Sequence, residues 1–351
     1  MSEARGIATD GAPGYAAPAW LPGGHAQTIW PYFLPRRSIA LRRERVDTPD
    51  GDFWDFDWLD TPAPDAPLLV LFHGLEGSSE SHYARALLTA LEPRGWRGVV
   101  PHFRSCGGAP NRRPRVYHSG DHEEIGAMLA AVRARVPPAT TVVAVGVSLG
   151  GSALLNWLGR AGTSAASTLT AAAAVSAPLD LMAAGIAIGQ GLNRLYTWHF
   201  LQTLRPKSLE LARRFPGALD PARVRSARTM WAFDDAVTAP LHGFGGTDDY
   251  WTRASSKPWL ARIAVPTLVL NARNDPFIPA TSLARTAEVS PQVLLEQPEH
   301  GGHAGFATGP FPGRLDWLPR RLLAWFDNAA RDDGGHGAPS ENAPGGPGTA
   351  A

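Results

Sequence analysis

Residues 146–150, Gly-Val-Ser-Leu-Gly, place Ser148 between two glycines in a pattern suited to nucleophilic chemistry. An apolar, β-branched run at residues 140–145 precedes this pattern, and residues 152–158 after it are helix-like. The order predicts a strand, a sharp turn and a helix. Glycines let the strand and the helix approach closely around a turn that exposes the serine hydroxyl. We therefore predict that Ser148 is a nucleophile.

A serine nucleophile needs a base to take its proton and an acid to orient that base. Asp275 follows a predicted strand that ends near residue 270, and His303 follows the last predicted strand. Both fall in loops at the carboxyl ends of strands, where open α/β sheets build their sites. Asp275 precedes a proline and could be an ordinary turn residue. His300 is the rival base, and the glycines that flank His303 favour His303.

The negative charge that develops on a carbonyl oxygen needs two backbone N–H donors. One is expected from Leu149, the residue after the nucleophile. The other is expected from the loop after the strand at residues 68–72, most plausibly from Leu75. His73 precedes the glycine of this loop, and we interpret it as a structural or site-shaping residue.

The elements that must position these residues alternate between short apolar runs and helical segments. Such alternation predicts an α/β fold with a mostly parallel sheet and helices on both faces. Strands are expected near residues 68–72, 98–103, 141–145, 169–175, 266–270 and 292–295, and helices at 81–91, 121–136 and 315–329. An antiparallel pair, residues 38–48 and 52–59, joined by a Pro-Asp-Gly turn, comes first.

These elements indicate a single large α/β domain at residues 38–331, although 351 residues could also form two smaller domains. Residues 1–37 are expected to form a partly disordered N-terminal segment, with residues 1–19 poorly ordered. Residues 332–351, rich in Gly and Pro, are expected to be a disordered tail. The alternation stops at residues 180–258, which we interpret as a mostly helical insertion.

Aromatic residues are frequent in this insertion, and they could line a substrate pocket above Ser148 or simply pack its own core. The tentative pocket consists of His73 together with Trp198, Phe200, Phe233 and Phe244. Trp231 and Trp251 lie in the same insertion. If several rings line the pocket, enzymatic activity should rise as the acyl chain of the substrate lengthens. It should fall once the chain is longer than the pocket.

Composition excludes several classes of function. A formal net charge of +1 with interspersed acids and bases argues against nucleic acid and against a polybasic membrane patch. The single cysteine, Cys106, excludes an intrachain disulfide and a thiolate metal site, and it suits a packing role. We expect no metal, no cofactor, no integral membrane segment and a cytoplasmic location. Oligomeric state stays open.

Together these motifs resemble the α/β-hydrolase superfamily and, within it, the YheT-like branch. The blocks that carry the resemblance span most of the chain: residues 24–28 (Gly-His-Ala-Gln-Thr), 73–81, 117–121, 146–151, 233–240 and 301–306. The resemblance implies Ser148, Asp275 and His303 as a catalytic triad. It also draws attention to Asp234 and Asp235, which we interpret as structural residues that cap or pair within the insertion. Asn274 departs from the branch, which often has a second aspartate there.

The resemblance implies esterase or lipase-like activity on small-molecule or lipid esters, including acylglycerols or phospholipids in some relatives. We expect a serine-dependent carboxylic ester hydrolase for short- to medium-chain acyl esters or acylglycerols. An acyltransferase on the same scaffold is an alternative, because both reactions pass through an acyl-enzyme. A non-catalytic binding protein is a third reading, and the intact set of triad residues argues against it.

Overall fold

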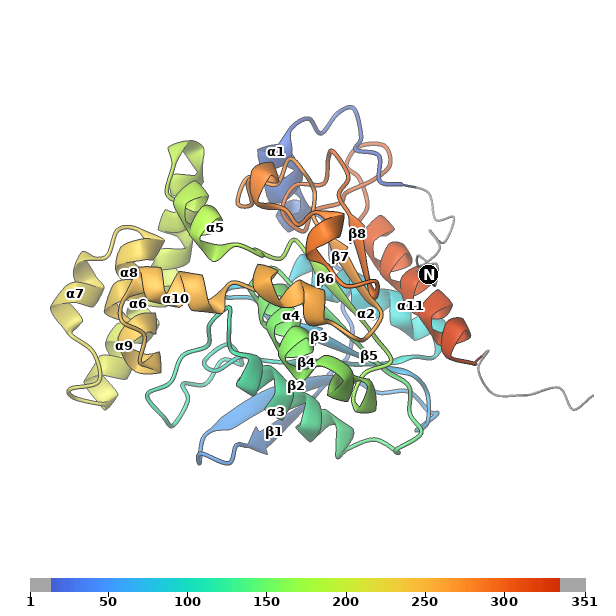
Figure 1. The fold of residues 1–351 in the computed structure, drawn as a ribbon, viewed down its shortest axis with the longest axis horizontal. Helices are drawn as coiled ribbons and strands as arrows, with labels where there is room; N and C mark the ends of the chain where they lie inside the picture. The colour runs from blue at the N-terminus through green and yellow to red at the C-terminus, as the bar shows by residue number, and fades with distance from the viewer. Residues whose placement is uncertain (1–13, 335–351) are drawn as a thin grey trace, which may run out of the picture.

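A mostly parallel sheet of eight strands forms the centre of the computed structural model, which describes residues 14–334 (Figure 1). The strand order is β1-β2-β4-β3-β5-β6-β7-β8, and only β1 and β2 run antiparallel to their neighbours. The strands are β1 (Arg42–Asp47), β2 (Phe53–Leu59), β3 (Leu68–Phe72), β4 (Arg97–Pro101), β5 (Val142–Val147), β6 (Ala171–Val175), β7 (Thr267–Leu270) and β8 (Val293–Glu296).

Helices cover both faces of this sheet, as the alternation of elements predicts. The helices are α1 (Gly24–Ile29), α2 (His82–Leu91), α3 (His122–Arg133), α4 (Leu149–Ala161), α5 (Leu181–Ile188), α6 (Arg194–Arg214), α7 (Pro221–Ser226), α8 (Met230–Ala236), α9 (Thr238–His242), α10 (Thr247–Ala254) and α11 (Trp317–Gly334). One core packs α3 and α4 against the sheet, and the other packs α2 and α11 against the opposite face. Every residue of β3 and β5 is buried, because both faces of these strands are covered.

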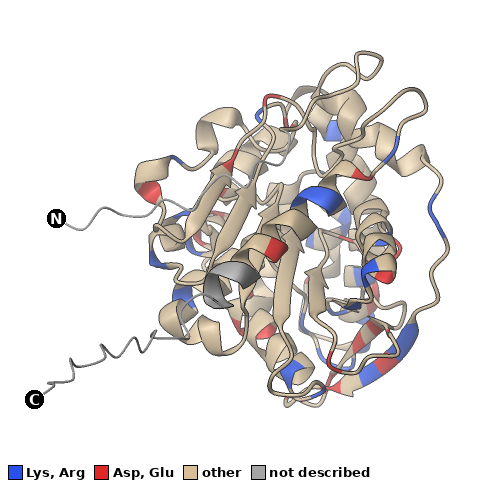
Figure 2. Cartoon of the chain, turned by 90° about the vertical axis from the view of Figure 1, so that its right-hand side faces the viewer, with Lys and Arg blue, Asp and Glu red and all other residues tan. Residues whose placement is uncertain are grey.

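Several predicted boundaries were wrong by a few residues. The first strand begins at Arg42 rather than at residue 38, because Arg42 lies opposite Trp58 and β2 ends one residue later, so earlier residues have no partner strand. The predicted strand at 98–103 ends at Pro101, and the closing helix runs on to residue 334. The charged edge strand β1 is visible in Figure 2 as a striped ribbon.

The prediction that residues 1–19 are poorly ordered was wrong for residues 14–19, which the structure describes. Tyr15 packs edge-on against Phe306 and Trp317, and its hydroxyl donates to the carbonyl oxygen of Ala307 at 2.8 Å. Tyr15 thus attaches the start of the described chain to the body of the protein. Residues 1–13 and 335–351, for which disorder was also predicted, lie outside the described residues.

Between β6 and β7 the chain forms the six helices α5 to α10, which lie together at one end of the molecule (Figure 1). These helices have a core of their own, which includes Leu201, Val224 and Val237. As predicted, the neighbouring aspartates pair within this helical segment. Asp234 accepts hydrogen bonds from the Thr238 hydroxyl at 2.6 Å and the Trp251 indole at 2.8 Å, and Asp235 pairs with Arg223. Burial raises the pKa of Asp234 to about 6.

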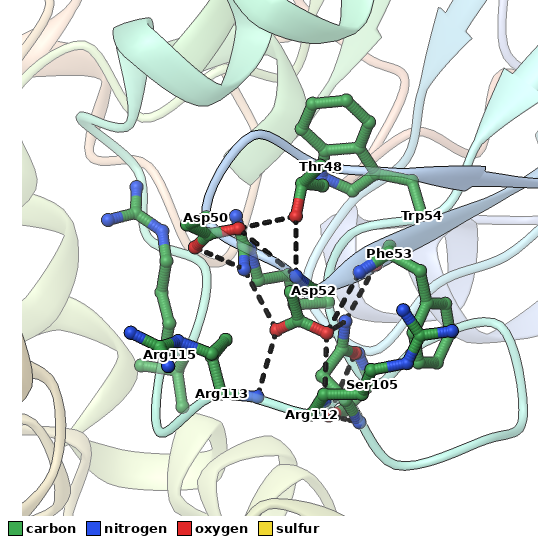
Figure 3. Close-up of polar contacts among 12 residues, drawn as sticks. Thr48, Asp50, Asp52, Phe53, Trp54, Ser105, Arg112, Arg113 and Arg115 are labelled. Carbon is green, nitrogen blue, oxygen red and sulfur yellow. Dashed lines mark hydrogen bonds and ion pairs between the residues drawn. The ribbon is translucent and has the colours of Figure 1, made fainter.

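A buried polar network fixes the loop that follows β4 (Figure 3). Asp52, which has no exposed surface, accepts the backbone N–H groups of Arg112 and Arg113 at 2.8 and 3.2 Å. Arg104 donates to Asp52 on one side at 2.8 Å and to Glu124 of α3 on the other, also at 2.8 Å. The network therefore joins the β1–β2 turn, this loop and α3.

Hydrogen bonding decides the charge state of Asp52. Burial by itself would raise the pKa of this carboxyl group, but the hydrogen bonds that it accepts lower the pKa below its ordinary value. A group whose folded-state pKa is lowered stabilises the protein above its unfolded pKa, which is about 3.9 for aspartate. This contribution is lost as the pH falls through the lower, folded-state pKa.

Replacing Arg104 with methionine should lower the free energy of unfolding by about 3–5 kcal/mol, because buried Asp52 then loses its cation and buried Glu124 keeps only Arg115, at 3.5 Å. Urea denaturation at pH 7 measures the change. The control is Arg213→Met, which breaks an exposed pair with Glu210 and should cost at most about 1 kcal/mol. Equal stabilities for the two variants would contradict the structural importance of the network.

Candidate active site

Ser148 sits on a strained turn between β5 and α4. Its φ of 54° lies in the region that L residues rarely adopt, and its N–H donates to the carbonyl oxygen of Val175 at 2.8 Å. A Cβ on Gly146 would lie 2.5 Å from the carbonyl oxygen of Gly150, and one on Gly150 would lie 2.5 Å from that of Phe72. Only glycine fits at these two positions. The structure thus confirms the prediction that the glycines allow the strand and the helix to approach closely.

A continuous hydrogen-bond chain links Ser148, His303 and Asp275. The Ser148 Oγ lies 2.9 Å from Nε2 of His303, and Nδ1 of His303 lies 2.8 Å from Oδ2 of Asp275. Because a carboxylate only accepts, Nδ1–H donates to Asp275 and Nε2 is left to accept the serine O–H. The Asp275 side chain is fully buried, and its Oδ1 accepts the N–H of Phe277 at 2.8 Å.

The rival histidine does not join this chain. His300 is exposed and lies 3.3 Å from the side-chain amide of Asn274. The loop after β8 holds His303 in place through its own backbone: the N–H of His303 donates to Thr28 Oγ1 at 2.9 Å, and that of Ala304 donates to Ser176 Oγ at 2.9 Å. Geometry therefore favours His303 over His300 as the base.

The backbone N–H groups of Leu75 and Leu149 are the predicted oxyanion donors. Neither makes a hydrogen bond with any residue in the described part of the chain. Leu149 opens the 13-residue helix α4, whose N-terminus carries partial positive charge. Leu75 follows Gly74, at which a Cβ would come within 3.1 Å of the Ser148 Cβ. Both N–H groups thus come from segments packed around Ser148.

His73 holds the loop that carries Leu75. Its Nδ1–H donates to the carbonyl oxygen of Gly74 at 2.8 Å, and its Nε2 accepts the N–H of Phe103 at 3.2 Å. Burial lowers the pKa of His73 to about 3, so the ring is neutral. Since the Gly74 carbonyl and the Leu75 N–H belong to one peptide group, His73 orients the amide from behind.

The next residue of this loop is tied to the helical segment above it. Glu76 has a φ of 54°, and its N–H donates to the Tyr117 hydroxyl at 2.8 Å. Its carboxylate accepts from the same hydroxyl at 3.0 Å and pairs with Lys207 of α6 at 2.8 Å. The loop that carries Leu75 is therefore fixed from below by His73 and from above by α6.

A cavity of about 510 Å³ opens beside Ser148 and His303. Its lining comes from the loops after β3, β4 and β7 and from the helical segment between β6 and β7. Of the predicted pocket residues, Phe200 and Phe233 lie in this lining. The lining also includes apolar and aromatic side chains outside the tentative pocket, among them Leu204, Met230, Tyr250, Trp251, Phe277 and Ile278.

Three of the tentative pocket residues were wrong. His73 is fully buried behind the Leu75 loop and does not line the cavity. Trp198 is 62% exposed on the outer side of α6. Phe244 packs against Tyr250 and His118 instead of facing the cavity. A helix presents only part of its circumference to one pocket, and residue composition alone does not give that orientation.

Sequence reasoning gave no role to Gln27, which clamps both loops of the hydrogen-bonded chain. Gln27 Oε1 accepts the side-chain N–H of Asn274 at 2.9 Å and the backbone N–H of Gly301 at 2.8 Å. Asn274 in turn accepts the N–H of Gly302 at 3.0 Å. The only signal for Gln27 was its position in the block at residues 24–28, one of those that carry the family resemblance.

A metal-binding cluster and a membrane-spanning helix are both absent from the described residues. Among residues 14–334 no group of three or more His, Cys, Asp and Glu side chains is arranged to hold a metal ion. No helix in the same range is long and apolar enough to cross a membrane.

Cys106 has a thiol pKa raised to about 12 by burial, which fits the predicted packing role.

Comparisons with known proteins agree with this architecture. The family model for the alpha/beta hydrolase fold matches residues 67–310. In solved structures, the esterase Pf2001 of Pyrococcus furiosus superposes with a TM-score of 0.51 at 15% identity, covering 84% of this chain and 92% of the other. Est1E of Butyrivibrio proteoclasticus, with ferulic acid bound, gives a TM-score of 0.52 at 15% identity over 82% of this chain and 99% of the other. At such identities these likenesses concern the fold alone.

The chain belongs to the α/β-hydrolase fold family. Within this family it falls in the YheT-like branch, since it is 39% identical to "Putative esterase YheT" of Escherichia coli (strain K12) over 86% of this chain and 89% of that protein. It is also 31% identical to human "Phospholipase ABHD3" over 87% of this chain and 76% of that protein. Family membership and fold are therefore as the sequence predicted.

Replacing Gln27 with methionine should lower the free energy of unfolding by about 1–3 kcal/mol, because the buried Gly301 N–H loses its acceptor. Hydrogen exchange of the Gly301 amide should accelerate with it. The matched control is Gln202→Met at an exposed position of α6, which should change stability by less than about 0.5 kcal/mol. Unchanged Gly301 exchange in the Gln27 variant would rule out the clamp.

Proposed function

We propose that the protein is a serine-dependent carboxylic ester hydrolase, in which Ser148 is the nucleophile, His303 the base and Asp275 the residue that orients His303. The observation that carries the proposal is the hydrogen-bond chain from Ser148 Oγ through His303 to Asp275, at the edge of a 510 Å³ cavity. The names of the relatives, an esterase and a phospholipase, support ester substrates.

In the first half of the proposed reaction, Ser148 Oγ attacks the ester carbonyl carbon while its proton passes to Nε2 of His303. The carbonyl oxygen becomes an oxyanion, which the N–H groups of Leu75 and Leu149 stabilise. When the tetrahedral intermediate collapses, the bond between the carbonyl carbon and the alkoxy oxygen breaks. His303 gives its proton to the departing alcohol, and the acyl group stays on Ser148.

Water completes the cycle by the same route in reverse. His303 takes a proton from water, the hydroxide oxygen adds to the acyl carbon, and collapse returns the proton to Ser148 with release of the carboxylic acid. Asp275 stays ionised throughout and stabilises the imidazolium form of His303. An added alcohol that competes with water would yield a new ester, so product analysis measures the share of acyl transfer.

The helical segment at residues 180–258 serves in this proposal as a cap over the nucleophile. It supplies Phe200, Phe233 and Trp251 to the cavity lining, and Lys207 ties it to the Leu75 loop. A cavity lined mainly by rings and aliphatic side chains favours an acyl chain over a polar group. The substrate class is therefore esters of short- to medium-chain acids, including acylglycerols.

Ser148→Ala and His303→Ala should each lower kcat for a p-nitrophenyl ester by about 10⁴–10⁶, because each removes a member of one catalytic unit. His300→Ala, the matched control, should stay close to the unaltered enzyme, because His300 lies outside the hydrogen-bonded chain. Circular dichroism checks that all three variants are folded. Full turnover by a folded Ser148→Ala variant would refute the assignment.

Activity across p-nitrophenyl esters should rise with acyl length by about 0.8 kcal/mol of binding per added CH₂ until the cavity is full, and then fall. Ala184 of α5 lines the cavity, so Ala184→Phe should move the optimum to shorter chains. Ala187 lies on the same helix outside the lining, and Ala187→Phe should leave the optimum in place. A flat profile, or the same shift in both variants, would show that this cavity does not hold the acyl chain.

A further inference from the structure

Exposed apolar side chains gather on three segments of the chain. Of the nine large apolar side chains that are exposed in the described residues, all except Trp231 belong to these segments. We call this set the apolar face. It comprises Ile29, Tyr32 and Phe33 of the N-terminal segment, Ile186, Leu192, Leu195 and Trp198 of α5, α6 and the turn between them, and Phe311 of the loop before α11.

The three segments are neighbours in the structure. His25 of α1 stacks on Tyr196 of α6 with the ring planes 6° apart, and its Nδ1 lies 3.1 Å from the tyrosine hydroxyl. Trp30 packs on Phe311 with the ring centroids 5.6 Å apart, and its indole N–H donates to the Pro312 carbonyl at 2.7 Å. In Figure 1, α1 and the α5–α6 turn both rise on the upper side of the molecule.

The apolar face is larger and more exposed than folding requires. Phe33 is 73% exposed, Phe311 69% and Leu192 67%, so none of these side chains contributes much to a core. Single exposed apolar residues are ordinary on protein surfaces, but a cluster of them marks a surface that contacts a partner. Aromatic rings together with leucine and isoleucine are the composition of side chains that enter the headgroup region of a bilayer.

The segments that carry the apolar face hold cationic side chains and no acidic ones. Residues 14–43, 181–209 and 300–315 contain no aspartate or glutamate, although they contain several arginines. Arg37 pairs with Glu92 and Arg314 with Asp316, but Arg36 and Arg194 form no ion pair with any residue in the described range. An apolar surface bordered by unpaired arginines is complementary to anionic lipid headgroups.

We propose that the apolar face docks on the surface of an anionic phospholipid bilayer. The same elements form one wall of the cavity. On α5, Ala184 and Ile188 line the cavity while Ile186 points to solvent, and on α6, Phe200 lines it while Trp198 is exposed. Docking therefore places the outer side of this wall against the lipid. The proposal concerns binding and does not depend on the chemistry assigned to Ser148.

Vesicle co-sedimentation with the Ser148→Ala protein tests docking apart from catalysis. Vesicles of phosphatidylcholine alone and of phosphatidylcholine mixed with phosphatidylglycerol are the two probes. The protein should sediment more with the anionic vesicles, and high salt should weaken this preference through screening. The double variant Arg36→Glu and Arg194→Glu should lose the preference. No sedimentation with either vesicle would overturn the proposal.

The apolar contribution is tested with Trp198→Ala combined with Phe311→Ala, which should weaken partitioning at least about tenfold. Trp231→Ala removes an exposed tryptophan outside the apolar face and should partition like the parent. In the enzyme that retains Ser148, the combined Trp198→Ala and Phe311→Ala changes should not alter the rate of hydrolysis of a soluble short-chain ester. An equal loss of vesicle partitioning in the Trp231→Ala control would overturn lipid docking. A stable dimer that the Trp198 and Phe311 changes break would also overturn it, and would show that the apolar face binds a second copy of the chain.

Discussion

The site depends on one steric constraint, the close approach of β5, α4 and β3 around Ser148. The turn holds Ser148 at a φ of 54°, a conformation that costs on the order of 1–3 kcal/mol and persists only where neighbours enforce it. A side chain on Gly146 or Gly150 would collide with backbone atoms. Packing of the two cores on either side of the sheet maintains this geometry, so fold stability and exposure of the hydroxyl are linked.

The other groups reach Ser148 from segments far apart in the chain, and polar contacts hold each of them. Gln27 ties the loops of Asp275 and His303 together from the N-terminal side. His73 fixes the peptide of Leu75 from below, while Lys207 reaches the same loop from the helical segment above it. The helical segment is thus connected both to the proposed oxyanion donors and to the apolar face.

Local patterns were sufficient to predict the alternation of strands and helices along the chain and the turn at Ser148, because both rest on short-range chemistry. Boundaries such as the start of β1 depend on the partner strand, which a local pattern does not contain. The orientation of Trp198 and Phe244 depends on how helices pack, and the clamp by Gln27 joins residues about 270 positions apart. Such features follow from tertiary contacts, and the sequence signalled Gln27 only through the family resemblance.

The most direct measurement of the central claim is intact-protein mass spectrometry after reaction with a fluorophosphonate, which traps an activated serine. The account predicts a single covalent adduct, mapped by peptide analysis to Ser148, that forms rapidly in the unaltered protein and very slowly in His303→Ala. An adduct on a different residue, no adduct on the folded protein, or labelling that is independent of His303 would contradict Ser148 as an activated nucleophile.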